Sequence, residues 1–271
     1  MNSDVYRLAF VLLAGGQSSR YDGNKLLSEH PITKLPLVQH SANEVIRARD
    51  EIASLSKNPV TVITGKWHDS VNSQLAEAFC GLPELTIEVI HNRQWEEGLA
   101  SSIRSGLSHL LSLSLQPKTS LSPTLLPESL LPEAASLPET ASLSTKPSHV
   151  LFTLADLPSL NRQDLIRLID ASKAHPHNIV CSEWQMDGLK DGQKDGLKDG
   201  QKYGEPNSRL TVPAILPEAM YSELLALQGD TGAKPLIKKY AKLGKVTAVS
   251  IPNAQFDIDT PQDWEKFKKR R

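Results

Sequence analysis

The sequence of 271 residues has little cysteine, almost no net charge and no long apolar run. Its two cysteines, Cys80 and Cys181, are too few for a disulfide scaffold and indicate a reducing compartment. A net charge of −1 creates no long-range field that favours nucleic acid or an anionic membrane. No apolar run approaches the ~20 residues that span a bilayer, and the first ten residues lack the layout of a signal peptide. We therefore expect a cytoplasmic protein that binds neither nucleic acid nor a membrane.

Several common catalytic motifs are absent as well. The sequence contains no Cys/His spacing typical of a zinc site and no Ser-His-Asp signature. It also contains neither GxGxxG nor GxxxxGK[ST], so we invoke neither of those two phosphate-binding mechanisms.

Apolar periodicity divides the chain into alternating strands and helices. Strands are expected at 10–13, 60–63, 86–90, 149–154, 178–182, 210–216 and 246–251. Helices are expected at 37–49, 67–79, 99–111, 161–173, 218–227, 233–243 and 261–269. This order predicts an α/β fold with a mostly parallel sheet, in which Pro213 marks an edge strand or a bulge.

Two low-complexity segments interrupt this pattern, and we expect both to be surface insertions in a single domain that spans 1–271. Residues 112–147 are rich in Ser, Leu and Pro, and the prolines prevent a continuous helix. Residues 186–207 contain DGLKDGQK twice, and this Gly-rich, charge-paired composition cannot bury enough apolar surface to order itself.

A glycine-containing segment with two cations follows the first strand and is the first candidate for a binding site. Leu13 and Ala14 lead into Gly15 and Gly16, where the backbone can turn tightly and expose its amides. Arg20 and Lys25 then supply two spaced cations, so the segment suits a triphosphate. For a bare Gly-Gly pair followed by Arg, however, an ordinary glycine turn with two solvated cations is the favoured interpretation.

Acidic residues provide candidate metal ligands. Asp156 follows the strand at 149–154, and Mg²⁺ prefers one or two carboxylates together with phosphate oxygens. Asp257 and Asp259 are the second candidates, and the residues do not rank one above the other. The alternative is local: Asp156 can form a turn before Pro158, and Asp257 to Thr260 can simply cap the last helix.

Two further groups of residues are expected at the same sheet edge, because ligands bind at the carboxyl ends of parallel strands. Gly65 follows the second strand, and Gly98 permits close backbone approach before Ser101 and Ser102 at a helix start. These serines can cap the helix or contact a base and ribose. Elsewhere, a Gly-rich turn opens a later helix and forms a possible anion site or an ordinary interhelical turn; its residues are Gly229, Asp230, Gly232 and Lys234.

The motif LAGGQSSR…K at 13–25 resembles the signature loop of the MobA-like nucleotidyltransferases, although Tyr21 and Asp22 stand where that family usually has Met-Gly. Leu26-Leu27, which directly follow Lys25, and the segment 91–103 resemble the branch that contains molybdenum cofactor cytidylyltransferase. GDTGAK at 229–234 and DIDTP at 257–261 resemble the family's later motifs. The resemblance implies a Rossmann-like sheet with helices on both faces.

The resemblance also implies an activity and roles for residues. The enzyme would transfer a nucleotidyl group, favouring CMP from CTP, to a phosphorylated acceptor of the molybdopterin type, with a molybdoenzyme as partner. Arg20, Lys25 and Asp156 would be catalytic, and Mg²⁺ would be held by Asp156 with Asp257 or Asp259. Residues 13–16, Gly65, Gly98, Ser101 and Ser102 would bind nucleotide, and the 229–234 segment would bind the acceptor. Alternatives are a guanylyl or other acceptor specificity, or a non-catalytic nucleotide-binding chaperone.

Overall fold

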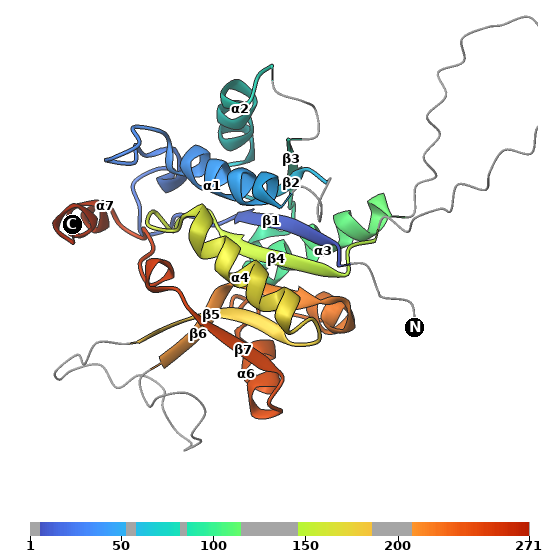
Figure 1. Cartoon of the computed structure of the whole chain (residues 1–271). Coiled ribbons are helices and arrows are strands. Elements are labelled where there is room, and N and C mark those ends of the chain that lie inside the picture. Colours follow the sequence, from blue (N-terminus) through green and yellow to red (C-terminus); the bar gives the residue numbers. More distant parts are fainter. Residues whose placement is uncertain (1–5, 53–57, 82–85, 115–145, 186–207, 271) are drawn as a thin grey trace, which may run out of the picture.

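A seven-stranded sheet with the order β3-β2-β1-β4-β6-β5-β7 forms the centre of the computed structural model (Figure 1). The structure describes residues 6–52, 58–81, 86–114, 146–185 and 208–270. The strands are β1 (Leu8–Ala14), β2 (Val60–Thr64), β3 (Ile87–His91), β4 (His149–Leu154), β5 (Ile179–Gln185), β6 (Ser208–Pro217) and β7 (Val246–Ser250). The helices are α1 (Leu37–Glu51), α2 (His68–Ala78), α3 (Leu99–Leu113), α4 (Arg162–Ala174), α5 (Tyr221–Leu225), α6 (Lys234–Lys242) and α7 (Pro261–Lys269).

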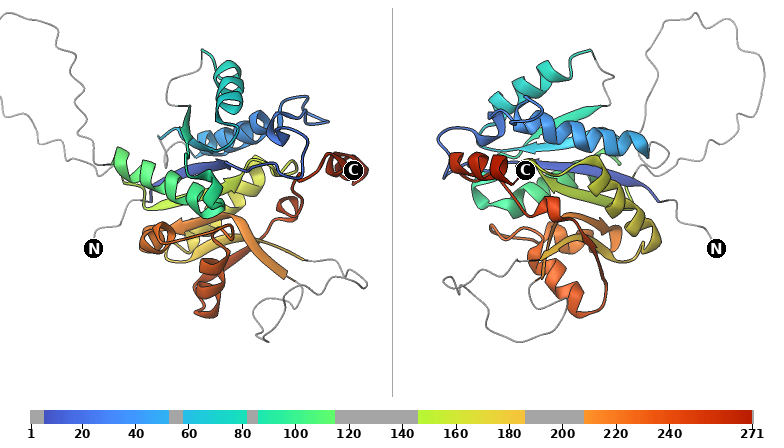
Figure 2. Two further views of the ribbon diagram at one scale, coloured as in Figure 1. Left: turned by 180° about the vertical axis from the view of Figure 1, so that it is seen from behind. Right: turned by 60° about the vertical axis from the view of Figure 1, so that its left-hand side comes forward.

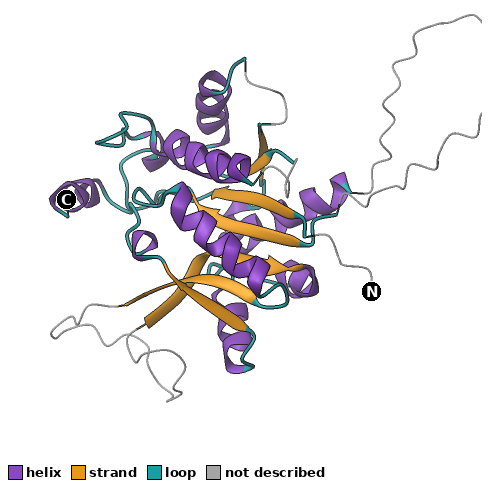
Figure 3. Ribbon diagram, viewed as in Figure 1, coloured by secondary structure: helices purple, strands orange, loops and turns teal. Residues whose placement is uncertain are grey.

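Strand β1 divides the core into two layers. All seven of its residues are buried, and alternate side chains enter different apolar clusters because successive side chains of a strand point to opposite faces. Leu8, Phe10 and Leu12 pack with α1, α2, α4 and α7. Ala9 and Val11 pack on the other face with α3, α5 and α6, which Figure 2 shows from behind. Helices therefore cover both faces of a Rossmann-like sheet in a single α/β domain, as expected (Figure 3).

Strand β6 is the exception to parallel pairing. It runs antiparallel to both β4 and β5, while the other adjacent strands pair in parallel. The expectation that Pro213 marks a sheet edge is wrong, because β6 lies inside the sheet. The alternative of a bulge is confirmed: Cys181 pairs with Ala214 and Ser182 with Thr211, so Val212 and Pro213 bulge out of register.

The expected helices and strands are present with boundaries that shift by a few residues. The helix expected at 218–227 is a 3₁₀ turn (Glu218–Met220) followed by the short helix α5. Helix α4 begins with Asn161 as its N-cap, and Asp164 completes a capping box. Helix α3 extends through Leu113, so the first residues of the 112–147 segment finish a helix. Most of that segment and the DGLKDGQK repeats lie outside the described residues. The described residues contain no helix able to cross a membrane.

The carboxyl ends of β1, β2, β3 and β4 meet at one edge of the sheet, and the chain returns to this edge before α7. The Ile258 N–H donates to the Asp156 carbonyl (3.0 Å), which ties the segment before α7 to the turn after β4. Ile258 is fully buried between Asp257 and Asp259. Residues 102 positions apart in the sequence, Asp156 and Ile258, are therefore brought to one place, beside the glycine turn after β1.

Candidate active site

Two cations and two carboxylates form an ion-pair network at this edge. Lys25 Nζ lies 2.7 Å from Asp156 Oδ2 and 3.2 Å from Asp259 Oδ1. Arg20 Nη2 lies 2.6 Å from Asp259 Oδ2. The Lys25 side chain is only 9% exposed, whereas that of Arg20 is 69% exposed. Lys25 is thus the buried centre of the network and Arg20 its solvent-facing end.

The ionisation of this network reflects the crowding of charges. Burial alone would lower the pKa of Lys25, but the carboxylates of Asp156 and Asp259 outweigh it and raise the pKa above its ordinary value. Asp257 completes the acidic group: its partial burial, then the charges of Asp156 and Asp259, raise its pKa. Three carboxylates therefore face two cations, an excess of negative charge that suits a bound metal ion.

Local structure fixes each of these groups. Lys25 opens a 3₁₀ turn (Lys25–Leu27) whose first amide is capped by the Asn24 side chain. The Ser41 hydroxyl on α1 donates to the Ala155 carbonyl (2.9 Å), which anchors the turn that carries Asp156. The Asp263 carboxylate at the start of α7 accepts from the amides of Asp259 and Thr260. The predicted capping by this last segment and the ion-pair role of Asp259 therefore coexist.

The glycine turn packs closely against the ends of β2 and α3. A side chain at Gly65 would collide with the Gly15 carbonyl and with Trp95 Cβ, so only glycine allows the ends of β1 and β2 to approach this closely. The Ser102 hydroxyl lies directly behind Gly15. Asn92 donates to Ser101 Oγ (2.8 Å) and Ser102 Oγ (3.2 Å), and all three side chains are buried. Ser102 therefore packs against the glycine turn, whereas Ser101 donates to the Gly98 carbonyl at the start of α3 (2.8 Å).

Tyr21 and Asp22, the departure from the family's loop, face different ways. Tyr21 packs against the core cluster and its hydroxyl accepts from Trp264 Nε1 on α7 (3.2 Å). Trp264 also donates to Ser28 Oγ (3.1 Å), which in turn donates to the Lys25 carbonyl. Asp22 is exposed and forms no ion pair with another described residue. The tyrosine therefore anchors the loop to α7, while the carboxylate turns toward solvent.

The 229–234 segment packs on the start of α3. Asp230 Oδ1 accepts from the Leu99 N–H (3.2 Å), and the Gly229 carbonyl accepts from the Ala100 N–H (3.1 Å). Gly98 has φ +95°, and a side chain there would lie 2.8 Å from Asp230 Cα. Gly229 and Asp230 therefore satisfy amides at the helix N-terminus, and a role for Gly229, Asp230, Gly232 and Lys234 in acceptor binding stays a prediction.

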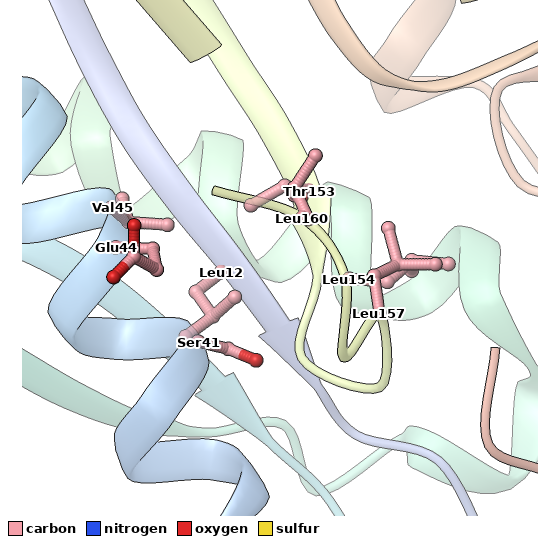
Figure 4. Close-up of a pocket in the computed structure, with 8 residues that line it drawn as sticks. All are labelled: Leu12, Ser41, Glu44, Val45, Thr153, Leu154, Leu157 and Leu160. Carbon is pink, nitrogen blue, oxygen red and sulfur yellow. The ribbon is translucent and has the colours of Figure 1, made fainter. Parts of the chain in front are cut away.

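A cavity of about 160 Å³ lies between this segment and the acidic group. Asp257, Thr231 and Lys234 line it, and the β5–β6 pair contributes Trp184 and Arg209. By contrast, the gap between α1, β1 and β4 that Figure 4 shows, lined by Leu12, Ser41 and Thr153 among others, has no room for a water molecule. Of these two, the cavity beside Asp257 is the one that can receive a ligand.

The residues present fit a divalent cation that is shared with a phosphate. No three His, Cys, Asp or Glu side chains within the described parts of the chain converge enough to hold a metal alone. However, Asp156 Oδ1 is buried and has no hydrogen-bond partner, while its other oxygen meets Lys25. An unpaired buried carboxylate oxygen is costly, and Mg²⁺ usually takes one or two carboxylates and completes its shell with phosphates and water.

The structure thus brings together most of the residues that the sequence singled out. Arg20, Lys25, Asp156, Asp257 and Asp259 form one cluster; Gly15, Gly65, Ser101 and Ser102 lie beside it; Gly98 joins the 229–234 segment. Sequence reasoning missed Trp184, Arg209 and the Trp264–Tyr21 contact. Trp184 and Arg209 flank the low-complexity repeat and carry no motif, so no sequence signal pointed to them.

Comparison with known proteins places the chain. The crystal structure of 4-diphosphocytidyl-2C-methyl-D-erythritol synthase from Anaerococcus prevotii DSM 20548 is similar at a TM-score of 0.62 with 13% identity, covering 99% of this chain and 98% of that one. Rv0371c from Mycobacterium tuberculosis H37Rv follows at 0.54 with 17% identity, covering 97% and 98%.

A second structure of that mycobacterial protein, a complex with manganese, is similar at a TM-score of 0.52 with 16% identity, covering 98% and 100%. No curated protein matches the chain. The model of the MobA-like NTP transferase domain matches residues 10–243. The chain therefore belongs to the MobA-like NTP transferase family and is a nucleotidyltransferase with a nucleoside triphosphate as substrate.

Proposed function

We propose that the chain transfers CMP from CTP to a phosphorylated acceptor of the molybdopterin type and that it uses Mg²⁺. The observation that carries the proposal is the cluster of Lys25 and Arg20 with Asp156, Asp257 and Asp259 beside the glycine turn. Such a cluster can hold a triphosphate with its cations and a divalent cation with its carboxylates. Gly15, Gly16 and Arg20 would line the triphosphate, and Gly65, Gly98, Ser101 and Ser102 would shape the nucleotide site.

The reaction needs positioning and charge neutralisation more than covalent chemistry. An oxygen of the acceptor phosphate attacks the α-phosphorus in line, a new P–O bond forms, the α–β bridging bond breaks, and pyrophosphate leaves. Lys25 and Arg20 exchange their carboxylate partners for phosphate oxygens and offset the charge that develops. Mg²⁺, held by Asp156 with Asp257 or Asp259, would supply further charge neutralisation when bound. The protein forms no covalent intermediate.

The choice of CTP rests on the segment 91–103 and on fold likeness. This segment resembles the cytidylyltransferase branch and supplies Asn92, Ser101 and Ser102 behind the glycine turn. A solved structure of the same fold is a diphosphocytidyl-methylerythritol synthase. That likeness also favours a second candidate, in which the acceptor is a smaller alcohol or sugar phosphate. The cavity of about 160 Å³ supports it, since ligand pockets usually measure ~300–1,000 Å³.

Pyrophosphate release by the purified protein tests the proposal. CTP, GTP and UTP are offered separately with Mg²⁺ and with either a molybdopterin-type or a polyol phosphate acceptor. We expect acceptor-dependent release with CTP and none from Asp156→Asn, checked for folding by its melting curve. Release with GTP alone would contradict the choice of nucleotide, and release with the polyol phosphate alone would favour the second candidate. Equal rates for wild type and Asp156→Asn would remove Asp156 from the mechanism.

A further inference from the structure

The cavity beside Asp257 contains an unexplained polar group. Trp184 on β5 lines this cavity, and its indole Nε1 is buried without a hydrogen-bond partner among the residues the structure describes. Leaving a buried donor unpaired costs its full desolvation, so such groups are rare in folded proteins unless a ligand or water completes them. The donor therefore suggests that the cavity is completed by a bound molecule.

Arg209 is held next to this indole by the sheet. Trp184 and Arg209 are directly opposite each other in the antiparallel β5–β6 pair, and the guanidinium carbon lies 5.6 Å from the indole ring centre. Stacking on an aromatic ring leaves the guanidinium N–H groups available to an anion such as a phosphate. No carboxylate of a described residue forms a salt bridge with Arg209. Its charge is thus presented to the cavity on a rigid strand pair.

The other residues that line the cavity are partly apolar and partly charged. The lining includes Lys234 as a second cation, and its apolar members include Leu99, Leu154, Val212 and Ile237. Asp257 stands on the side of the catalytic cluster. A ligand that fits this distribution carries an anionic group and a compact apolar or planar body.

We infer that Arg209 and Trp184 select the acceptor: Arg209 binds its phosphate monoester, and the Trp184 N–H donates a hydrogen bond to the polar edge of a planar body attached to that phosphate. This inference rests on the proposed function, because it assigns the second substrate of the same site. It names phosphate monoesters with a planar or apolar body as the substrate class, and it excludes bare alcohols and nucleosides, which offer no anion to Arg209.

Calorimetric titration of the full chain with phenyl phosphate tests the inference without requiring turnover. Phenyl phosphate offers both a monoester and a planar body, whereas methyl phosphate and phenol each offer one. We expect phenyl phosphate to bind more tightly than either. Arg209→Ala should weaken its binding at least about tenfold, as expected for the loss of a charge-assisted contact. Phenyl phosphate has no polar edge for the indole, so Trp184→Ala, which removes the ring, should weaken it about fivefold through lost packing.

A second probe isolates the indole N–H. 4-Nitrophenyl phosphate adds an acceptor group at the far edge of the ring, and Trp184→Phe keeps an aromatic ring while removing the donor. We expect Trp184→Phe to weaken 4-nitrophenyl phosphate by about fivefold and to leave phenyl phosphate within about twofold. Equal losses for both probes would overturn the role of the N–H.

The matched control is Arg47→Ala, which removes an exposed guanidinium of α1 that pairs with Glu44. It should leave all the titrations unchanged. Phenyl phosphate binding that is absent in wild type, or that is the same in Arg209→Ala as in wild type, would overturn the inference. Titration with CTP distinguishes a failure of this inference from a failure of the proposed function. Absence of CTP binding by the wild-type protein would contradict the proposed function. An Arg209→Ala variant that keeps its CTP affinity but binds phenyl phosphate more weakly would support a separate acceptor subsite.

Discussion

At the scale of single residues, the charged groups of the cluster differ in how much each contributes to the stability of the fold. Lys25 is buried and bonded to two carboxylates, so its removal would leave Asp156 with an uncompensated charge. Breaking such a buried pair typically costs about 3–5 kcal/mol. A kinetic defect in a Lys25 variant would therefore mix unfolding with lost catalysis, and Arg20 is the better residue for a kinetic test.

Arg20→Ala should raise the KM for the nucleotide or lower kcat at least about tenfold, since one charge-assisted contact is worth ~1.5–3 kcal/mol. The side chain is 69% exposed, so little stability depends on its pair with Asp259. Steady-state kinetics at varied CTP measure the effect, and the melting temperature serves as the folding control. Unchanged kinetics would mean that the triphosphate does not contact Arg20.

Asp257→Asn should raise the melting temperature at neutral pH when metal is removed with EDTA. Burial and the neighbouring carboxylates raise the pKa of Asp257 in the folded protein, so its charged form is disfavoured there. The destabilisation caused by charged Asp257 is absent below the ordinary Asp pKa of about 3.9, and it is fully present once the pH exceeds the raised pKa of Asp257 in the folded protein. The gain in Asp257→Asn should therefore shrink as pH falls toward 4.

Added Mg²⁺ supplies the comparison for this variant, because it should stabilise wild type more than Asp257→Asn if Asp257 is a ligand. Melting curves at two pH values, with and without Mg²⁺, record both effects. A lower melting temperature of the variant at neutral pH would show that Lys25 outweighs the acidic neighbours at this position.

At the scale of elements, helix α7 does more than close the fold. Trp264 joins it to the chain on both sides of Lys25, through the Tyr21 hydroxyl and through Ser28 Oγ. Trp264→Phe removes both hydrogen bonds and should lower the free energy of unfolding by about 1–3 kcal/mol. The KM for CTP should rise as well, because Lys25 lies between Tyr21 and Ser28, the two residues that Trp264 anchors. Tyr21→Phe removes one bond and should give a smaller change; equal effects on KM would contradict anchoring at two points.

The contact between α3 and the 229–234 segment depends on Gly98. Gly98→Ala should destabilise the protein by more than the cost of a positive φ alone, because the new methyl group would lie 2.8–2.9 Å from the backbone of residues 229 and 230. Gly81→Ala is the matched control: Gly81 has φ +80°, and among the described residues other than its chain neighbours no atom lies within 4 Å of an added Cβ. Denaturant unfolding of the two variants separates the backbone strain of a positive φ from the collision of the new methyl group. Equal losses in the free energy of unfolding would refute the close contact.

Periodicity was sufficient to predict the elements, but not the pairing of β6. The apolar pattern at 210–216 predicts a strand without its direction, because an antiparallel partner is set by the connection from β5 rather than by side chains within the strand. Pro213 was compatible with an edge or a bulge, and only the register of β5 with β6 decides between them. Likewise, the motif at 257–261 predicted acidic residues near the site, whereas the pairing of Asp259 with Lys25 and Arg20 required the tertiary structure.

At the scale of the whole molecule, the fold assembles one charged site from the two ends of the chain. Residues 15–25 follow the first strand and residues 257–259 precede the last helix, yet the Lys25–Asp259 pair joins them. A Rossmann-like sheet makes this possible because its parallel strands end at one edge. The second substrate would enter from the β5–β6 side of that edge, where the cavity lies.

The central claim is that this edge binds a nucleoside triphosphate together with a divalent cation. Anomalous difference density from a crystal of the full chain grown with CTP and Mn²⁺ tests it most directly. We predict a manganese peak bonded to Asp156 and to Asp257 or Asp259, with the triphosphate along the loop from Gly15 to Lys25. A triphosphate bound elsewhere, or a peak that touches none of these three carboxylates, would contradict the account.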